Sequence, residues 1–314
     1  MDVDAAPKVS DTMVDGSPGS SGGAQADVSL RSDERDRAMR PLILIVDDEA
    51  VNRTILRKML DTLGYRTHVA INGQEAVEAA RRERYAAILM DCLMPVLDGY
   101  DATRAIRQDE ASLPADVVER HVPVIAVTAV ALQGARERCL AVGMDDYLSK
   151  PVIAQSLAAV LKRWIDDRRS TSPWTLDDAP GTPMGDAGLL DRRAIEALRE
   201  LGADDWEAFL AEVIDDFRRD VSSRIEDARS AVATGDAGAL VQSLHTIAGC
   251  AAMVGAVQVE RLARSWPAHH LTEGGSPQAS ADIRALEAAF ARTCAMLETA
   301  VGPELAPGAG AARA

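Results

Sequence analysis

The sequence has few aromatic side chains. Phe, Trp and Tyr make up 4% of its 314 residues, although hydrophobic residues as a whole make up 47%. A core with so few rings is built mainly from Ala, Leu, Val and Ile, which suits helices and an aliphatic sheet better than an aromatic-rich β-sandwich. The length allows two ordinary domains, so we expect two cores.

Positive charge is scarce in the second half of the chain. Residues 170–314 hold 22 acidic and 12 basic side chains and no lysine, and they contribute −10 to the formal net charge of −15. Nucleic-acid backbones are bound by clustered Lys and Arg, so this composition argues against a DNA-binding module. We expect no nucleic-acid partner.

Long apolar runs and closely spaced cysteines are also missing. The first residues show no basic segment followed by an apolar one, and no stretch approaches the roughly 18 apolar residues of a membrane span. We therefore expect a cytoplasmic protein without membrane insertion. The cysteines lie far apart without a CxxC pair, which indicates buried thiols rather than disulfides or a metal site, at Cys92, Cys139, Cys250 and Cys294.

Three segments rich in Gly, Ser, Pro and Ala divide the chain. Residues 1–39 contain too few large apolar side chains to offset the entropy cost of ordering, so we expect a disordered leader. Pro and Gly interrupt residues 169–188, which predicts a linker, and residues 301–314 predict a disordered tail. The sequence thus predicts domains at residues 40–168 and 189–300.

The first predicted domain alternates short apolar runs with amphipathic segments. Strands are predicted at residues 42–46, 65–70, 86–90, 124–128 and 146–150, and helices near 50–63, 73–83, 99–110, 133–142 and 153–167. This repeated order predicts an α/β fold, a doubly wound parallel sheet with helices on both faces. Ligands of such sheets bind at the carboxyl ends of the strands.

Polar side chains follow these predicted strands. Asp47 and Asp48 follow the first strand, Asp91 follows the third, Thr128 ends the fourth, and Lys150 ends the fifth. Crowded carboxylates repel one another unless a cation offsets them, and oxygen ligands with room for water suit Mg²⁺. We expect the three aspartates to bind Mg²⁺.

Asp91 is placed to act as a nucleophile toward a phosphoryl group. Such attack needs a metal and a further cation and hydroxyl that hold the phosphoryl oxygens, roles that suit Lys150 and Thr128. The chain lacks the Gly-rich loop and Lys-Ser/Thr of a P-loop, so no ATP-binding kinase is predicted, and the chain would catalyse only its own aspartyl phosphorylation and phosphotransfer. Taken singly, each residue is more often a turn former or helix cap; only the combination indicates a site.

The site residues lie in five motifs: VDDEAVNR (46–53), NGQEA (72–76), MDCLMPVLDGY (90–100), VTA (127–129) and GMDDYLSKP (143–151). In order and spacing these motifs resemble the receiver domains of two-component response regulators, particularly those attached to hybrid sensor kinases. The resemblance implies a flavodoxin-like fold with Asp91 as phosphoacceptor, Asp47 and Asp48 at the Mg²⁺ site, and Lys150 on the phosphoryl oxygens.

The resemblance also implies a conformational switch. Thr128 would move toward the phosphoryl group while Tyr147 turns inward, and the Lys150–Pro151 peptide bond would be cis. Leu93 and Val130 flank the expected path of a hydrolytic water, and neither offers a polar group to orient it. We therefore expect slow self-dephosphorylation; an acyl phosphate lifetime of only seconds would contradict this.

The second predicted domain shows helical spacing throughout. Apolar side chains recur at three- and four-residue steps within residues 206–232, 240–254 and 283–297, and Gly235 with Asp236 separates the first two stretches. Short connections between such helices favour an all-α, antiparallel four-helix bundle.

His245 lies at the edge of the second apolar stripe, so it should be partly exposed. Gly249, one turn later, leaves space beside its ring. The segment HTIAGCAAMVGA (245–256) resembles the signature of histidine phosphotransfer domains, which implies that His245 becomes phosphohistidine. Ala248 departs from this pattern, because the family usually has a lysine there, and its absence weakens the charge compensation of a phosphohistidine.

These features predict a phosphorelay intermediate. A sensor histidine kinase would phosphorylate Asp91, which would pass the group to His245 for transfer to the receiver of a further response regulator. Two alternatives stay open. The chain could be a phosphorylation-controlled interaction module whose helical domain only docks a partner, which Ala248 favours, or a phosphate sink that loses phosphoryl groups from Asp91 to water.

Overall fold

The computed structural model describes residues 39–113, 121–128, 135–166, 188–266 and 277–301. Nearly all of the predicted leader, linker and tail lie outside these residues. The described residues from Pro41 onward form one compact unit.

Short apolar segments form a parallel sheet in the first domain. The strands are β1 (Leu42–Val46), β2 (Arg66–Ala70), β3 (Ala87–Asp91), β4 (Val124–Thr128) and β5 (Asp146–Ser149). Every residue of β1, β3 and β4 is buried, as expected for central strands covered on both faces. The 5-stranded sheet has the order β2-β1-β3-β4-β5 with all neighbours parallel, which confirms the predicted doubly wound sheet. The order reverses between β1 and β3, the point where such sheets bind ligands.

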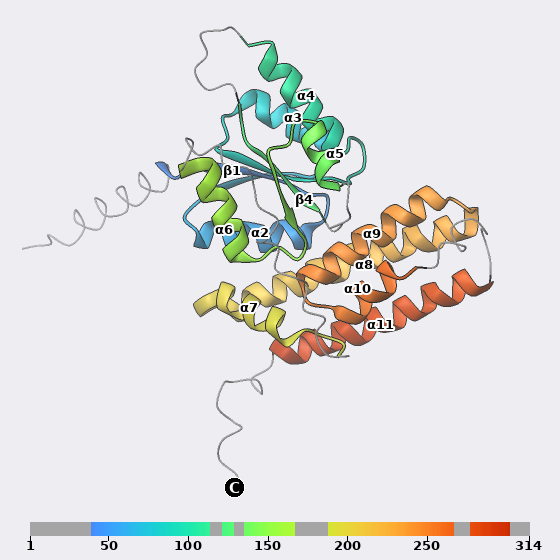
Figure 1. Cartoon of the computed structure of the whole chain (residues 1–314). Helices are drawn as coiled ribbons and strands as arrows, with labels where there is room; N and C mark the ends of the chain where they lie inside the picture. Colours follow the sequence, from blue (N-terminus) through green and yellow to red (C-terminus); the bar gives the residue numbers. More distant parts are fainter. Residues whose placement is uncertain (1–38, 114–120, 129–134, 167–187, 267–276, 302–314) are drawn as a thin grey trace, which may run out of the picture. The chain divides into compact units, whose positions relative to one another are not determined.

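Helices cover both faces of this sheet (Figure 1). They are α2 (Ala50–Thr62), α3 (Gly73–Arg82), α4 (Gly99–Ala111), α5 (Ala135–Ala141) and α6 (Ala154–Leu161), the last followed by a π-helical turn at Lys162–Asp166. Because side chains alternate across a strand, Ile43 and Ile45 pack on the side of α2 and α6, whereas Leu44 and Val46 pack on the side of α3, α4 and α5. The carboxyl ends of the strands stay free for the site.

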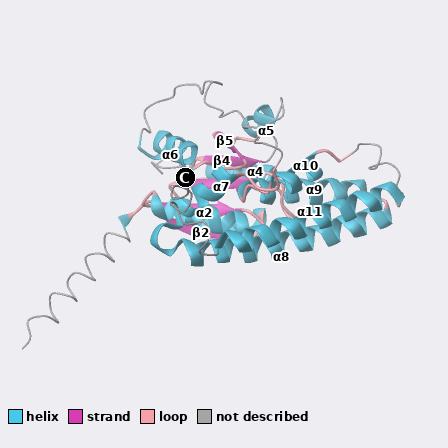
Figure 2. Ribbon diagram, turned by 90° about the horizontal axis from the view of Figure 1, so that it is seen from below, coloured by secondary structure: helices cyan, strands magenta, loops and turns pink. Residues whose placement is uncertain are grey.

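The described residues of the second domain are helical, as predicted. The helices are α7 (Arg192–Gly202), α8 (Trp206–Thr234, after a 3₁₀ turn at Ala203–Asp205), α9 (Ala237–Met253), α10 (Val257–Arg264) and α11 (Pro277–Val301). Helix α8 packs on α9 and α11, and α10 packs on the same two helices, which closes a four-helix bundle (Figure 2). Gly235 ends α8 with a φ of 72°, and the Asp236 side chain caps α9 by accepting a hydrogen bond from the Ala239 amide at 3.0 Å.

The two domains share one buried apolar cluster. It runs from the α2 and α6 side of the sheet into the bundle and includes Leu56 and Leu157 as well as Phe217 and Leu244. A second cluster is confined to the α3, α4 and α5 side of the sheet. Among the described residues, the two apolar clusters therefore do not follow the expected division into one core for each domain. The α2 side of the first domain packs against the helical domain.

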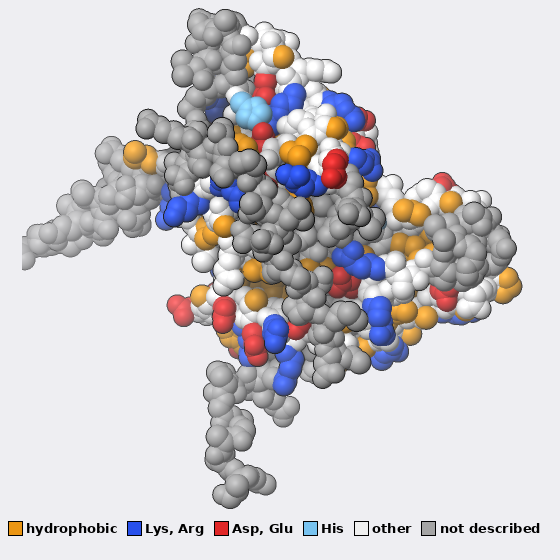
Figure 3. All heavy atoms as spheres, in the orientation of Figure 1, with side chains coloured by type: hydrophobic (Ala, Val, Ile, Leu, Met, Phe, Trp, Pro, Cys, Tyr) orange, Lys and Arg blue, Asp and Glu red, His pale blue; other side chains and the backbone are white. Residues whose placement is uncertain are grey.

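Charged side chains of opposite sign are interspersed on the face shown in Figure 3. Ion pairs among the described residues include Arg81 with Asp109 at 2.7 Å and Arg107 with Asp145 at 2.7 Å. The second pair belongs to a group that includes Glu110 and His121, just before β4 and away from the strands' carboxyl ends.

His121 gives a pH-dependent contribution to stability. Its hydrogen bonds to Asp145, at 2.6 Å, and to Glu110 raise the pKa of His121 to about 9. A raised pKa in the folded state stabilises the protein below the unfolded pKa of about 6.5, and this contribution is lost as the pH rises through about 9. Urea denaturation should show the wild type losing more unfolding free energy than His121→Gln between pH 6 and 10. Parallel pH profiles would contradict this.

Candidate functional site

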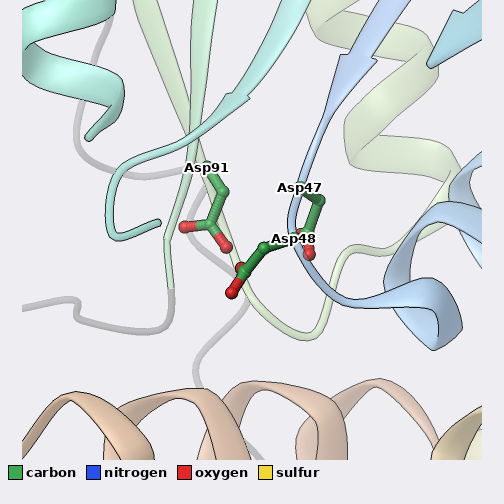
Figure 4. A group of neighbouring side chains, drawn as sticks. All are labelled: Asp47, Asp48 and Asp91. Carbon is green, nitrogen blue, oxygen red and sulfur yellow. The ribbon is translucent and has the colours of Figure 1, made fainter. Parts of the chain in front are cut away.

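Asp47, Asp48 and Asp91 converge where β1 and β3 end (Figure 4). Each offers a carboxylate oxygen, and these oxygens lie within 4.8 Å of one another. Asp47 and Asp91 are buried, and Asp48 is half-buried as a whole residue although its side chain is only 7% exposed. This spacing and this all-oxygen donor set fit a divalent cation of the size of Mg²⁺, with remaining positions open to water.

Lys150 lies against two of these carboxylates. Its Nζ atom donates hydrogen bonds to Asp47 Oδ2 at 2.9 Å and to Asp91 Oδ2 at 2.6 Å. Burial by itself lowers the pKa of Lys150, but the charges of Asp47 and Asp91 outweigh burial and raise it. A permanent positive charge therefore lies between the two aspartates, and it compensates part of the cost of burying them.

Asp47 is held more firmly than Asp91. Besides Lys150, the Glu49 amide donates to Asp47 Oδ1 at 2.9 Å, and Asn52 Nδ2 donates to both of its oxygens at 3.0 and 3.1 Å. Asp91 Oδ1 accepts only a long bond of 3.3 Å from the Leu93 amide among the contacts of the described residues. Asp91 is thus the better candidate for a carboxylate whose oxygen attacks another group.

The pKa values of Asp48 and Asp91 are raised even though cationic side chains lie beside them. Desolvation, and then the neighbouring charges of Asp47, Glu49 and Asp91, raise the pKa of Asp48 to about 8. Desolvation also raises the pKa of Asp91 to about 6, although Lys150 opposes the shift. Carboxylates that resist ionisation in this way are stabilised in their charged form when a cation joins them.

The other predicted residues of the first domain lie around this pocket. Thr128 is buried at the end of β4, where its carbonyl oxygen accepts a hydrogen bond from the Lys150 amide at 2.8 Å. Tyr147 is half-buried in β5, and the Lys150–Pro151 bond is cis, as the resemblance implied. Leu93 is half-buried. Val130 lies outside the described residues, so the slow dephosphorylation and the Thr128–Tyr147 switch stay predictions.

His245 of α9 lines the same cavity as Asp91. The cavity has a volume of about 10 Å³, enough for roughly one water molecule, and is lined by Glu49, Asn52, Asp91, Lys150, His245, Thr246 and Gly249. The imidazole is half-buried, in line with the predicted partial exposure. The sequence suggested His245 and Asp91 separately, but no sequence pattern placed them at one cavity.

The imidazole of His245 is held in its neutral form. Burial lowers the pKa of His245 to about 4, and the positive charges of Lys150 and Arg264 add to this effect. A neutral imidazole keeps an unprotonated ring nitrogen that can act as a nucleophile. Ala248, in the position where the resemblance expects a lysine, is buried in the bundle. Positive charge at His245 therefore comes from Lys150 of the first domain and Arg264 of α10.

One face of α8 contacts the first domain at regular intervals. Four α8 residues are spaced four apart and so share a helix face: Glu212, Asp216, Asp220 and Arg224. We call these residues the α8 row. The sequence did not lead us to predict the α8 row. The regular spacing of three acidic residues and one basic residue could have indicated it.

The α8 row contacts α2 and the loop that precedes it. Arg57 donates to Glu212 at 2.9 Å, Thr54 Oγ1 donates to Asp216 Oδ2 at 2.7 Å, and the Val51 amide donates to Asp220 Oδ2 at 2.8 Å. The Arg57 pair is exposed and contributes little, but the Thr54 bond is buried and the Val51 bond partly buried. These bonds hold α8, and with it α9, against the pocket.

Gly99 fixes the backbone of Asp91 from the start of α4. A Cβ atom at position 99 would lie 2.0 Å from the Asp91 carbonyl oxygen. Gly99→Ala should therefore lower the unfolding free energy by on the order of 3 kcal/mol and reduce phosphorylation of the remaining folded protein. Urea denaturation and phosphate labelling test both effects. Gly238→Ala is the matched control, because its Cβ would come no closer than 3.4 Å to Asp236 Oδ1. Equal stability of the two variants would contradict the role of Gly99.

Comparisons with known proteins identify both domains. Residues 43–162 match the family model of the response regulator receiver domain, and residues 212–299 match that of the Hpt domain. The chain is 42% identical over 124 residues to hybrid signal transduction histidine kinase G of Dictyostelium discoideum, across 39% of this chain and 3% of that protein. It is 30% identical over 259 residues to the sensor protein GacS of Pseudomonas syringae pv. syringae, across 80% of this chain and 27% of that protein.

The chain thus spans less than a third of the length of these curated relatives. A similar solved structure is the receiver domain of a sensor histidine kinase from Pseudomonas aeruginosa PAO1, crystallised with a magnesium ion coordinated in its active site cleft. It shares 51% sequence identity and covers 40% of this chain and 98% of its own, with a TM-score of 0.36.

None of the described helices has the length and apolar character that crossing a membrane requires. The matches, the doubly wound sheet and the helical bundle agree with one another. The chain therefore joins a response regulator receiver domain to an Hpt domain.

Proposed function

We propose that Asp91 accepts a phosphoryl group and passes it to His245 of the same chain, which then donates it to another receiver. The observation that carries this proposal is the cavity that Asp91 and His245 line together with Lys150. A phosphoryl donor and its acceptor that are held at one cavity react without the entropy cost of a separate encounter.

The bonds made and broken in the transfer step involve only the two residues and the phosphoryl group. The unprotonated ring nitrogen of His245 attacks phosphorus, an N–P bond forms, and the bond between phosphorus and the Asp91 oxygen breaks. The electron pair returns to the Asp91 carboxylate, where Lys150 Nζ, 2.6 Å from Oδ2 in the resting chain, compensates the recovered charge. Mg²⁺ held by Asp47, Asp48 and Asp91 would offset negative charge on the phosphoryl oxygens.

The partners follow from the chemistry of the two residues. A sensor histidine kinase is the source of the phosphoryl group on Asp91, and a receiver domain of a response regulator is the acceptor from His245. The chain's own receiver contacts the α8 row beside His245, so the downstream receiver must replace it there.

A second candidate function is an interaction module whose Hpt domain is not phosphorylated. Ala248 favours it, because the usual lysine is missing. The relay accounts for Ala248 differently, since Lys150 and Arg264 already bring positive charge to His245.

The variant His245→Gln separates the two functions. The full chain is labelled with a radioactive small-molecule phosphodonor in the presence of Mg²⁺. Alkali treatment then distinguishes the two kinds of label, because it cleaves acyl phosphate but leaves phosphohistidine intact. The relay predicts alkali-stable label in the wild type and none in His245→Gln, whose Asp91 label persists. His121→Gln, a histidine change far from the pocket, should label as the wild type does. Equal alkali-stable label in His245→Gln and the wild type would contradict the relay and favour the interaction module.

A further inference from the structure

Arg224 of the Hpt domain reaches into the acidic pocket of the receiver domain. Its Nη2 atom lies 2.7 Å from Asp48 Oδ2, and its Nε atom lies 2.6 Å from Glu49 Oε1. The acidic side chains are almost fully buried, with 7% and 4% exposure, and that of Arg224 is 25% exposed. Two charge-assisted hydrogen bonds at these distances form a strong, directional contact between the domains.

Both Mg²⁺ and the guanidinium of Arg224 would bind the carboxylate of Asp48. It belongs to the three aspartates whose spacing fits Mg²⁺, and the guanidinium of Arg224 holds one of its oxygens. Mg²⁺ requires carboxylate oxygens at about 2.1 Å in a near-octahedral arrangement, and it repels a guanidinium at hydrogen-bond distance from the same carboxylate. Glu49 is not one of the three aspartates, so Arg224 has a second anchor that the metal does not need.

We propose that Arg224 makes metal binding in the receiver pocket and docking of the Hpt domain oppose each other. A metal ion at Asp48 displaces the Nη2 contact and loosens α8 from α2, and docked α8 lowers the metal affinity of the pocket. The coupling is reciprocal by thermodynamic necessity. During transfer to His245, Arg224 releases Asp48 and keeps Glu49.

The inference rests on the proposed metal site but not on phosphoryl transfer. Its first test is metal affinity in the full unphosphorylated chain, with Mn²⁺ as a spectroscopic probe of the free ion and Mg²⁺ as competitor. Arg224→Gln should bind both ions roughly tenfold more tightly than the wild type, because the competing charge-assisted bond is lost. Arg218→Gln is the matched control, because Arg218 lies on the same helix but pairs with Glu298 of α11 at the surface of the helical domain, so this variant should bind as the wild type does.

Lysine and asparagine variants separate this mechanism from its alternatives. Arg224→Lys keeps the charge, but a single ammonium group cannot bridge Asp48 and Glu49, so it should tighten metal binding nearly as much as Arg224→Gln. A wild-type affinity in Arg224→Lys would contradict the bridging contact. Asp48→Asn should weaken Mn²⁺ binding; if it does not, the metal site itself is wrong and the inference falls with it.

The second test measures directly how firmly the Hpt domain docks on the receiver domain. The Val51 amide donates to Asp220 of the α8 row at 2.8 Å, so its hydrogen exchange reports on the contact between the domains. Mg²⁺ should accelerate this exchange roughly tenfold in the wild type, by the same coupling that sets the metal affinity. In Arg224→Gln the exchange should be fast without Mg²⁺ and change little on its addition. Equal metal affinities of wild type and Arg224→Gln, or a Val51 exchange rate that Mg²⁺ leaves unchanged in the wild type, would overturn the proposal.

Discussion

Replacing Asp91 with asparagine is expected to abolish both alkali-labile and alkali-stable label from a small-molecule phosphodonor. The amide is a poor nucleophile, and the onward step to His245 has no other source of phosphoryl groups in this account. We expect a loss of on the order of a thousandfold in the initial labelling rate, as is typical when a nucleophile is removed. The measurement is a time course of both kinds of label in the full chain with Mg²⁺.

A matched carboxylate variant controls for the loss of charge. Asp101 lies in the first turn of α4 and is exposed, and its partner is Arg104. Asp101→Asn should label at the wild-type rate. Alkali-stable label in Asp91→Asn at the wild-type rate would show that His245 takes the phosphoryl group directly from the donor, which contradicts the order of transfer.

Removing the two buried contacts of the α8 row should slow transfer to His245 without affecting labelling of Asp91. In the double variant Asp216→Ala, Asp220→Ala the hydroxyl of Thr54 and the amide of Val51 lose their partners at 2.7 and 2.8 Å. Each such bond to a charged group contributes roughly 1.5–3 kcal/mol, so the docked population should fall by roughly a hundredfold or more. The rate at which alkali-stable label appears after Asp91 is labelled measures this population.

The control for this variant lies on the same helix. Glu226 is exposed and pairs with Arg229 within α8, so Glu226→Ala removes a carboxylate without touching α2. It should transfer at the wild-type rate. A double variant that transfers at that rate would mean that docking through the α8 row is irrelevant to transfer, and that Asp91 and His245 meet in another arrangement.

The sheet was predictable because its central strands are short apolar runs. LILIV of β1 and VIAVT of β4 are too short for helices and too apolar for exposed strands, and each lies fully buried at its predicted position. The pocket followed from the sheet, since residues after parallel strands meet at one edge. Asp47, Asp91 and Lys150 are accordingly joined by hydrogen bonds of 2.6 and 2.9 Å.

The sequence predicted helical structure throughout the second domain, but it did not mark α7 and α10 as separate helices. Both are short, at 11 and 8 residues, and α10 follows Gly255 within a few residues of the end of α9. An amphipathic pattern spans too few turns in such helices to stand out from a loop. Their positions are fixed by packing, α10 on α9 and α11 and α7 on α8, which sequence periodicity does not encode.

The joint cavity was beyond sequence reasoning for a different reason. Asp91 and His245 belong to separate domains, and their approach depends on how α8 contacts α2. Spacing of apolar residues reports the buried face of one element, but it does not name the partner of that face. The contact of Arg224 with the receiver pocket was not predicted for the same reason, since an arginine on a long helix is ordinarily solvated.

The central claim is that Asp91 and His245 exchange a phosphoryl group within one chain. The most direct measurement is the first-order rate constant for alkali-stable label in the wild type, followed after a pulse of phosphodonor over a hundredfold dilution of the protein. Transfer within the chain predicts one rate constant at every concentration. An apparent first-order rate constant that falls in proportion to protein concentration, or label on Asp91 that never becomes alkali-stable, would contradict transfer within the chain.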